Sequence, residues 1–174
     1  GVSGVDAGLI KAHKRPPVKV EGVTVDYGFV GDIDIVDGSV LKKLLDNGLM
    51  PVVSPLSADE SGQLLNINAD TVAAAIGASL GAEKLVLGTG APGILEDVAD
   101  PRSVISYTDL KGLDRLRETG AIKDGMLPKA KAIEIAIKGG VRRVHVISYD
   151  APDSILAEVF TNEGTGTLIV ADIK

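Results

Sequence analysis

The sequence predicts an α/β protein, a three-layer αβα sandwich on a mostly parallel, open sheet, with a β-hairpin near the N-terminus. Short apolar runs alternate with helical segments of about ten residues, which is typical of parallel strands joined by right-handed crossovers. Hydrophobic residues make up 45% of the chain but include only two Phe and no Trp, so Val, Ile, Leu and Ala must fill the core, as in a helix-covered parallel sheet. At 174 residues, the chain can bury roughly 70% of its unfolded surface.

Local signals predict the individual elements. Residues 16–26 are expected to form a hairpin that turns at Glu21-Gly22. Ser39 and Thr108 are the expected caps of two helices, and Pro128 the first residue of another. The expected helices span residues 39–47, 71–80, 108–118, 128–137 and 153–160. The expected strands after the hairpin are residues 50–54, 63–65, 84–87, 141–147 and 167–170.

Composition narrows the classes of partner. The net charge is −6, and the 18 basic residues are scattered, so nucleic acid and anionic membrane are poor partners. No run approaches the roughly 18 apolar residues of a membrane span, and no basic-then-apolar leader is expected. The chain contains no cysteine, which excludes disulfides and thiolate metal sites and favours the cytoplasm. Because the chain opens at Gly1 rather than Met, we expect a piece of a longer or processed protein.

Two amides and a carboxylate gather where a strand is expected to lead into a helix. Asn66, Asn68 and Asp70 fall between an extended run and a small-residue helix. In open α/β sheets, ligands bind outside the carboxyl ends of the strands. Capping of the helix by Asn68 or Asp70 explains one of these polar residues, but it does not explain all three.

A second polar region combines a glycine-rich loop with a lysine. Residues 88–93 have the G-x-G-x-x-G spacing, but Pro92 and the Asp100-Pro101 pair that soon follows argue against the long helix that a dinucleotide site requires. The backbone N–H groups of such a loop can still meet a phosphate or a ribose. Lys129 follows Pro128, so we expect its ammonium in the first turn of a helix, where the dipole attracts anions. Most of the other basic residues are expected to be solvated.

Residues 62–70 resemble the G-Q-x-x-N-[VI]-N-A-D segment of acetylglutamate kinases, in the amino-acid kinase family. Further similarities follow in family order: residues 2–8 with the substrate-side G-L-S-G-x-D-x-G segment, residues 26–32 with D-x-G-x-V-G-x-[IV], and residues 124–129 with G-G-M-x-x-K. The resemblance extends over essentially the whole chain. It implies part of the amino-acid kinase fold, with a substrate-side segment and hairpin in residues 1–35 and a nucleotide-binding lobe in residues 36–174.

The resemblance also implies an activity. Acetylglutamate kinases phosphorylate the γ-carboxylate of N-acetyl-L-glutamate with ATP in arginine biosynthesis. Mg²⁺ bridges the phosphates of the ATP, so the protein itself is not expected to supply metal-binding residues. Homo-oligomers are expected. The family's N-terminal half supplies a lysine and a glycine-rich phosphate loop that precede the matched region, so we expect this chain alone to be nearly inactive.

The implied site residues are carried over position by position. Lys129 and Asp70 are the expected catalytic residues, and Asn66, Ser3 and Gly4 are expected to bind the acyl-amino acid. The expected nucleotide contacts come from the loop and the following helix: Gly88, Thr89, Gly90, Gly93 and Met126. Thr89-Gly90 stand where the family usually has Thr-Asp or Ser-Asp, so this loop lacks the family's carboxylate.

The C-terminal segment suggests regulation. Glu163, Gly164 and Gly166 belong to a run similar to the E-G-x-G-T signature of arginine-inhibited acetylglutamate kinases. A carboxylate beside glycine turns suits a guanidinium group, although a plain turn into the last strand explains the same residues. Two other functions stay open: a non-catalytic module that senses nucleotide or arginine, and a kinase for a carrier-bound aminoadipate or glutamate.

Overall fold

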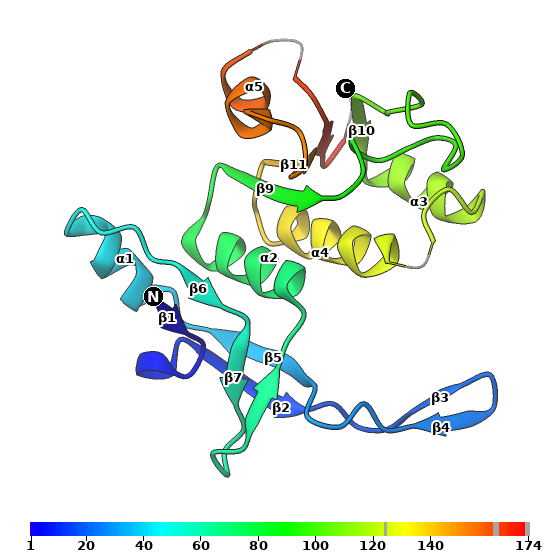
Figure 1. Cartoon of the computed structure of the whole chain (residues 1–174). Helices are drawn as coiled ribbons and strands as arrows, with labels where there is room; N and C mark the ends of the chain where they lie inside the picture. Colours follow the sequence, from blue (N-terminus) through cyan, green and yellow to red (C-terminus); the bar gives the residue numbers. More distant parts are fainter. Residues whose placement is uncertain (124, 162–163, 173–174) are drawn as a thin grey trace. The chain divides into compact units, whose positions relative to one another are not determined.

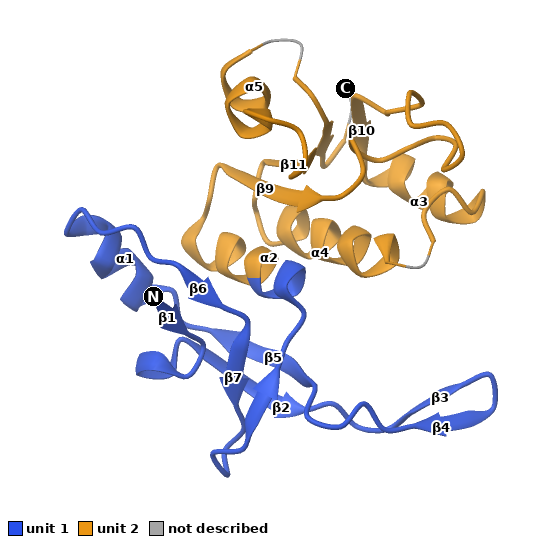
Figure 2. Cartoon of the chain, viewed as in Figure 1, with its two compact units in different colours: residues 1–72 blue, residues 73–174 orange. Residues whose placement is uncertain are grey.

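The computed structural model describes residues 1–123, 125–161 and 164–172 (Figure 1). The chain divides into two compact units, residues 1–72 and residues 73–174, and α2 (Ala69–Leu80) continues from the first into the second (Figure 2). The boundary between the two compact units therefore lies after residue 72. The expected substrate-side segment (residues 1–35) and nucleotide-binding lobe (residues 36–174) are functional divisions and stay a prediction. Among the described residues, no helix is both long and apolar enough to cross a bilayer.

The first unit is built on a four-stranded sheet. Its strands are, in spatial order, β5 (Gly31–Val36), β2 (Ile10–Lys14), β7 (Leu56–Ala58) and β8 (Leu64–Asn66). The β2–β7 pair is parallel, and the two outer pairs are antiparallel. The first unit also contains four short elements outside this sheet: β1 (Val2–Ser3), the 3-10 turn η1 (Asp6–Gly8), α1 (Ser39–Asp46) and β6 (Val53–Ser54).

The predicted hairpin is confirmed as β3 (Val18–Val20) and β4 (Val23–Val25). Val20 pairs with Val23, so only Glu21 and Gly22 form the turn, with φ of 49° and 83°. Two successive residues in the left-handed region give a turn whose twist matches that of the two strands, and glycine adopts this conformation at little cost.

The second unit contains a mixed sheet. Its strands are, in spatial order, β10 (Tyr107–Asp109), β12 (Thr167–Val170), β11 (Arg143–Ser148) and β9 (Lys84–Thr89). β12 is parallel to β10 and antiparallel to β11, while β11 and β9 run parallel over six residue pairs. The helices that accompany this sheet, apart from α2, are α3 (Leu110–Glu118), α4 (Met126–Lys138) and α5 (Ser154–Phe160).

Side-chain alternation along β11 separates two helical layers. Val144 and Val146 are fully buried in a core shared with Ile133 and Ala136 of α4. His145 lies between them in the strand, so its side chain points to the opposite face, where it contacts Glu158 of α5. Figure 1 shows α4 and α5 on opposite sides of β11. The α/β fold class is confirmed, although the strand pairing is more mixed than the sequence predicts.

The ends of several elements differ from the sequence predictions for identifiable reasons. Asp109, not Thr108, caps α3, because its carboxylate accepts the N–H of Gly112 at 2.7 Å, while Thr108 lies in β10. α4 begins at Met126, which makes Pro128 its third residue. The strand expected at residues 50–54 is reduced to Val53–Ser54, and the proline at position 51 has no N–H to donate to a ladder.

Gly166 provides a test of packing in the second unit. A Cβ at this position would lie 2.1 Å from the carbonyl oxygen of Val146, a rigid backbone atom, whereas a Cβ at Gly125 would meet nothing within 4 Å. We expect Gly166→Ala to lower the free energy of unfolding by roughly 1–3 kcal/mol, because an over-packed site must shift its backbone. Gly125→Ala is the control. Equal urea midpoints for the two variants would contradict this packing.

Candidate functional site

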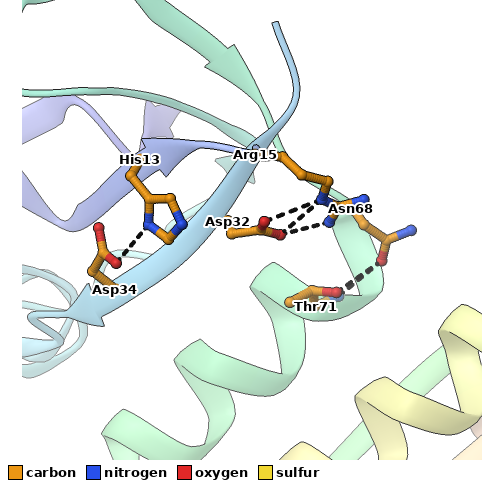
Figure 3. A network of polar contacts seen from close by, with 6 residues as sticks. All are labelled: His13, Arg15, Asp32, Asp34, Asn68 and Thr71. Atoms are coloured by element: carbon orange, nitrogen blue, oxygen red, sulfur yellow. Dashed lines mark hydrogen bonds and ion pairs between the residues drawn. The ribbon is translucent and has the colours of Figure 1, made fainter. Parts of the chain in front are cut away.

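The polar residues at the β8–α2 junction have different roles in the structure. Asn68 caps α2, because its Oδ1 accepts hydrogen bonds from the backbone N–H of Thr71 at 3.0 Å and from the Thr71 hydroxyl at 3.2 Å (Figure 3). The side chain of Asn66 is exposed, and its backbone N–H is held by the carbonyl oxygen of Phe29 at 2.8 Å. Asp70 lies half-buried in the first turn of α2. Capping therefore accounts for Asn68 and leaves Asn66 and Asp70 as candidates for function.

The sequence did not indicate an ion pair in the first unit between Arg15 and Asp32. Arg15 Nε is 3.1 Å from each carboxylate oxygen of Asp32 (Figure 3). The hydrogen bonds from Arg15 hold the pKa of Asp32 below its ordinary value. The backbone N–H of Arg15 also donates to the carbonyl oxygen of Val30, which is bridged to Asn66. The pair thus fixes the strand ends next to the exposed amide.

Ser3 and Gly4 lie in a tightly bonded turn. Ser3 donates its backbone N–H to Asp6 Oδ2 at 2.6 Å and its hydroxyl to the same oxygen at 3.0 Å. Gly4 donates its N–H to the carbonyl oxygen of Leu56 at 2.7 Å. Both backbone N–H groups are therefore engaged within the protein, which argues against their use as donors to a substrate. A substrate contact through other atoms of these residues stays a prediction.

In the second unit, Lys129 lies at the carboxyl end of β9. It is the fourth residue of α4, so the expectation of a first-turn lysine holds although the helix begins earlier than predicted. The residue is buried, and its Nζ donates a hydrogen bond to the carbonyl oxygen of Gly88 at 3.1 Å. An ammonium and a helix N-terminus in one place favour an anion there.

The loop after β9 borders a small apolar cavity. Gly88 and Thr89 close the strand, and Gly90 follows in the loop. A cavity of about 240 Å³ lies beyond them, and its lining is mostly apolar: Ala91, Gly93, Ile94, Leu95, Val98, Ala121, Lys123 and Met126. Gly93 has a packing reason to be glycine, because a Cβ there would lie 2.8 Å from Thr167 Oγ1. Of the expected nucleotide contacts, Gly93 and Met126 therefore line this cavity, whereas Gly88, Thr89 and Gly90 precede it along the chain.

Gly164 and Gly166 of the C-terminal motif border another cavity, of about 450 Å³. Glu163, the expected carboxylate of this motif, lies outside the described residues. The sequence did not indicate the buried carboxylate of Glu158, which also lines this cavity. Glu158 Oε2 accepts the N–H groups of Thr165 at 2.7 Å and Gly166 at 3.0 Å. A buried carboxylate thus shapes the glycine turn of the motif.

His145 also lines this second cavity. Its Nδ1 is 2.7 Å from Glu158 Oε1, while its Nε2 is buried and finds no hydrogen-bond partner within the described part of the chain. The histidine therefore lies within β11 with only one of its two ring nitrogens bonded among the described residues. Burial acts to raise the pKa of Glu158, but hydrogen bonds from His145, Thr165 and Gly166 outweigh it, and the pKa lies below its ordinary value.

Within residues 1–123, 125–161 and 164–172, no group of three or more His, Asp or Glu side chains is arranged to hold a metal ion. The first unit thus offers amide and carboxylate groups, and the second unit offers a cationic group and an apolar cavity. Neither unit has a metal-ligand cluster of its own within the described residues.

Comparison with known proteins defines the class. Residues 1–148 match the Amino acid kinase family, and because this match covers more than half of the chain, the chain belongs to that family. A curated relative, the acetylglutamate kinase of Myxococcus xanthus, is 51% identical over 99% of this chain. The chain spans 58% of the length of that relative.

Solved structures agree with this assignment. The N-acetylglutamate synthase from Neisseria gonorrhoeae, in complex with coenzyme A and L-arginine, aligns with a TM-score of 0.78 and 28% identity, covering 98% of this chain and 37% of that chain. Its complex with coenzyme A and N-acetyl-glutamate gives a TM-score of 0.80 at 28% identity, covering 99% of this chain and 38% of that chain.

The lowered pKa of Glu158 predicts a pH-dependent stability. Its carboxylate contributes stability that is fully present above its unfolded-state pKa and is lost as the pH falls through the lower folded-state pKa. Glu158→Gln should therefore make the free energy of unfolding less dependent on pH between about pH 5 and pH 3. Glu118→Gln, at an exposed position in α3, is the control. The same pH slope in Glu158→Gln and wild type would contradict the assignment.

Proposed function

We propose that the full-length protein transfers the γ-phosphoryl group of ATP to the γ-carboxylate of N-acetyl-L-glutamate, giving ADP and an acyl phosphate in arginine biosynthesis. The observation that carries this proposal is the buried ammonium of Lys129 at the carboxyl end of β9, next to a glycine loop and an apolar cavity. The 51% identity to an acetylglutamate kinase and the N-N-D motif of residues 66–70 support it.

The proposed nucleotide contacts come from the second unit. The base enters the apolar cavity beside Ala91, Gly93 and Met126, where it is removed from water. The phosphates lie toward Lys129 in the first turn of α4, while Gly88, Thr89 and Gly90 border the nucleotide. Mg²⁺ arrives with the ATP as part of the substrate and neutralises phosphate charge. Positioning and charge neutralisation are the main needs of phosphoryl transfer.

The proposed substrate contacts come from the first unit. Asn66 uses its exposed amide, both donor and acceptor, to bind the acyl-amino acid, with Ser3 and Gly4 as further contacts. The γ-carboxylate is already ionised at neutral pH, so no general base is needed. Asp70 is therefore assigned an electrostatic role, the orientation of cationic groups during transfer. Homo-oligomer formation and a cytoplasmic location remain predictions.

Lys129 gives the sharpest test of this function. In the full-length protein, Lys129→Ala should lower kcat at least about tenfold, because one preorganised charge at the transferred group is often worth 10²–10³-fold. Lys131→Ala, two residues along α4 at an exposed position, should not. Acyl phosphate trapped with hydroxylamine as a hydroxamate measures turnover.

Three outcomes of this assay are decisive. Turnover in Lys129→Ala equal to wild type would remove Lys129 from the site. ATP binding by the full-length protein without product would favour a nucleotide-sensing module. Product formed only from a carrier-bound aminoadipate or glutamate would favour the third reading of the sequence.

We also propose that L-arginine inhibits the full-length protein by binding beside Gly164 and Gly166. Glu158 and His145 also line the cavity that these glycines border, and His145 Nε2 has no hydrogen-bond partner among the residues that the structure describes. A relative in this fold was solved with L-arginine. Glu163 is proposed to add a carboxylate, which pairs well with a guanidinium group.

Arginine at millimolar concentration should then lower the activity of the full-length protein, and Glu163→Gln should relieve this inhibition while leaving the uninhibited activity intact. Ornithine, which offers a point charge instead of a planar guanidinium, should inhibit more weakly. The readout is the arginine concentration for half-inhibition. Inhibition that is unchanged in Glu163→Gln would remove this residue from the site, and indifference of the wild type to arginine would reduce the motif to a turn.

A further inference from the structure

The parallel pairing of β9 and β11 brings a second loop to the glycine loop. Ser148, the last residue of β11, pairs with Thr89, the last residue of β9. The chain after β11 therefore emerges beside Gly90, and the N–H of Tyr149 donates to the carbonyl oxygen of Thr89 at 3.0 Å. Ligands of open α/β sheets bind where the carboxyl ends of neighbouring strands meet. Tyr149 and Asp150 thus border the proposed nucleotide site.

The Tyr149 ring packs directly on the glycines. A Cβ on Gly88 would lie 3.6 Å from Tyr149 Cδ1, and a Cβ on Gly90 would lie 3.0 Å from Tyr149 Oη. A side chain at position 90 would therefore crowd the tyrosine. The glycine that replaces the family's loop carboxylate is matched, in this chain, by an aromatic ring from the neighbouring loop.

Asp150 brings a carboxylate to the same place. Its Oδ2 lies 3.9 Å from the position that a Cβ on Gly90 would occupy. The turn that carries it is fixed, because the N–H of Asp150 donates to Ser148 Oγ at 3.1 Å and the hydroxyl of Ser154 donates to the carbonyl oxygen of Ser148 at 2.7 Å. Within the described part of the chain, the Asp150 carboxylate has no hydrogen-bond or ion-pair partner, so it is available to a ligand.

The cationic, acidic and apolar groups along this loop lie in the same order as the phosphates, ribose and base of a nucleotide. The Lys129 ammonium is bonded at Gly88, the Asp150 carboxylate lies at Gly90, and the apolar cavity begins at Ala91. A cation suits phosphates, a carboxylate suits vicinal hydroxyl groups, and an apolar cavity suits a base. A carboxylate also repels phosphate, so it favours the ribose at Gly90.

We propose that Asp150 binds the 2′-hydroxyl of the ribose and replaces the carboxylate that the glycine loop lacks, while Tyr149 holds the loop in place. This inference rests on the proposed nucleotide site. It concerns only which residue binds the ribose. Measurements of nucleotide binding therefore test it independently of phosphoryl transfer.

Calorimetric titration of the full-length protein with ATP and with 2′-deoxy-ATP tests the proposal. Wild type should bind ATP about tenfold or more tightly than 2′-deoxy-ATP, since a hydrogen bond to a charged group contributes about this much. Asp150→Ala should weaken ATP binding by a similar factor and leave 2′-deoxy-ATP binding nearly unchanged, so that the preference disappears. Asp153→Asn, an exposed aspartate of the same loop, is the control and should keep the preference.

Other outcomes overturn the inference or separate it from the proposed activity. An unchanged preference in Asp150→Ala, or equal weakening of both nucleotides, would contradict a sugar contact. If the protein shows the sugar preference but forms no acyl phosphate, the inference stands and the proposed activity fails. If it forms acyl phosphate while Asp150→Ala keeps the preference, the activity stands and the inference fails. Absence of ATP binding by wild type would overturn both.

Discussion

The hydrogen bond from Lys129 Nζ to the carbonyl oxygen of Gly88 ties the first turn of α4 to the carboxyl end of β9. A buried ammonium needs a hydrogen-bond acceptor, and the strand end supplies one without adding a negative charge. The ammonium therefore lies at the strand end, close to the N-terminus of α4. Both the ammonium and the helix dipole attract an anion at this place. The proposed phosphate contacts depend on this orientation.

The core of the second unit holds α4 against the sheet that contains β9. The neighbours of Lys129 on α4, including Ala130 and Ile133, are buried against Val144 and Val146 of β11. β11 in turn runs parallel to β9, so the same packing fixes both strand ends. On the other face of the sheet, Glu158 joins α5 to His145 and to the glycine turn before β12. One strand, β11, therefore connects the proposed nucleotide site with the proposed regulatory cavity.

Local signals in the sequence predicted the fold class and the hairpin, because alternation, caps and turn glycines each depend on only a few neighbouring residues. They also predicted the first-turn position of Lys129, although Pro128 proved to be the third residue of the helix rather than the first. The sequence missed Arg15 and Glu158, since each meets its partner only through strand register or sheet topology. It missed Asp150 because the pairing of β11 with β9 brings this residue to Gly90. Asn68 and Asp70 were both candidate helix caps in the sequence, and the structure shows that Asn68 makes the capping bond.

A crystal structure of the full-length protein with a non-hydrolysable ATP analogue tests the central claim, that the carboxyl ends of β9 and β11 bind a nucleotide, most directly. We expect a phosphate oxygen within about 3 Å of Lys129 Nζ, hydrogen-bond distance for a charged pair. We also expect the base in the cavity beside Ala91 and Met126. A nucleotide bound elsewhere, or bound here without a phosphate contact to Lys129, would contradict the account.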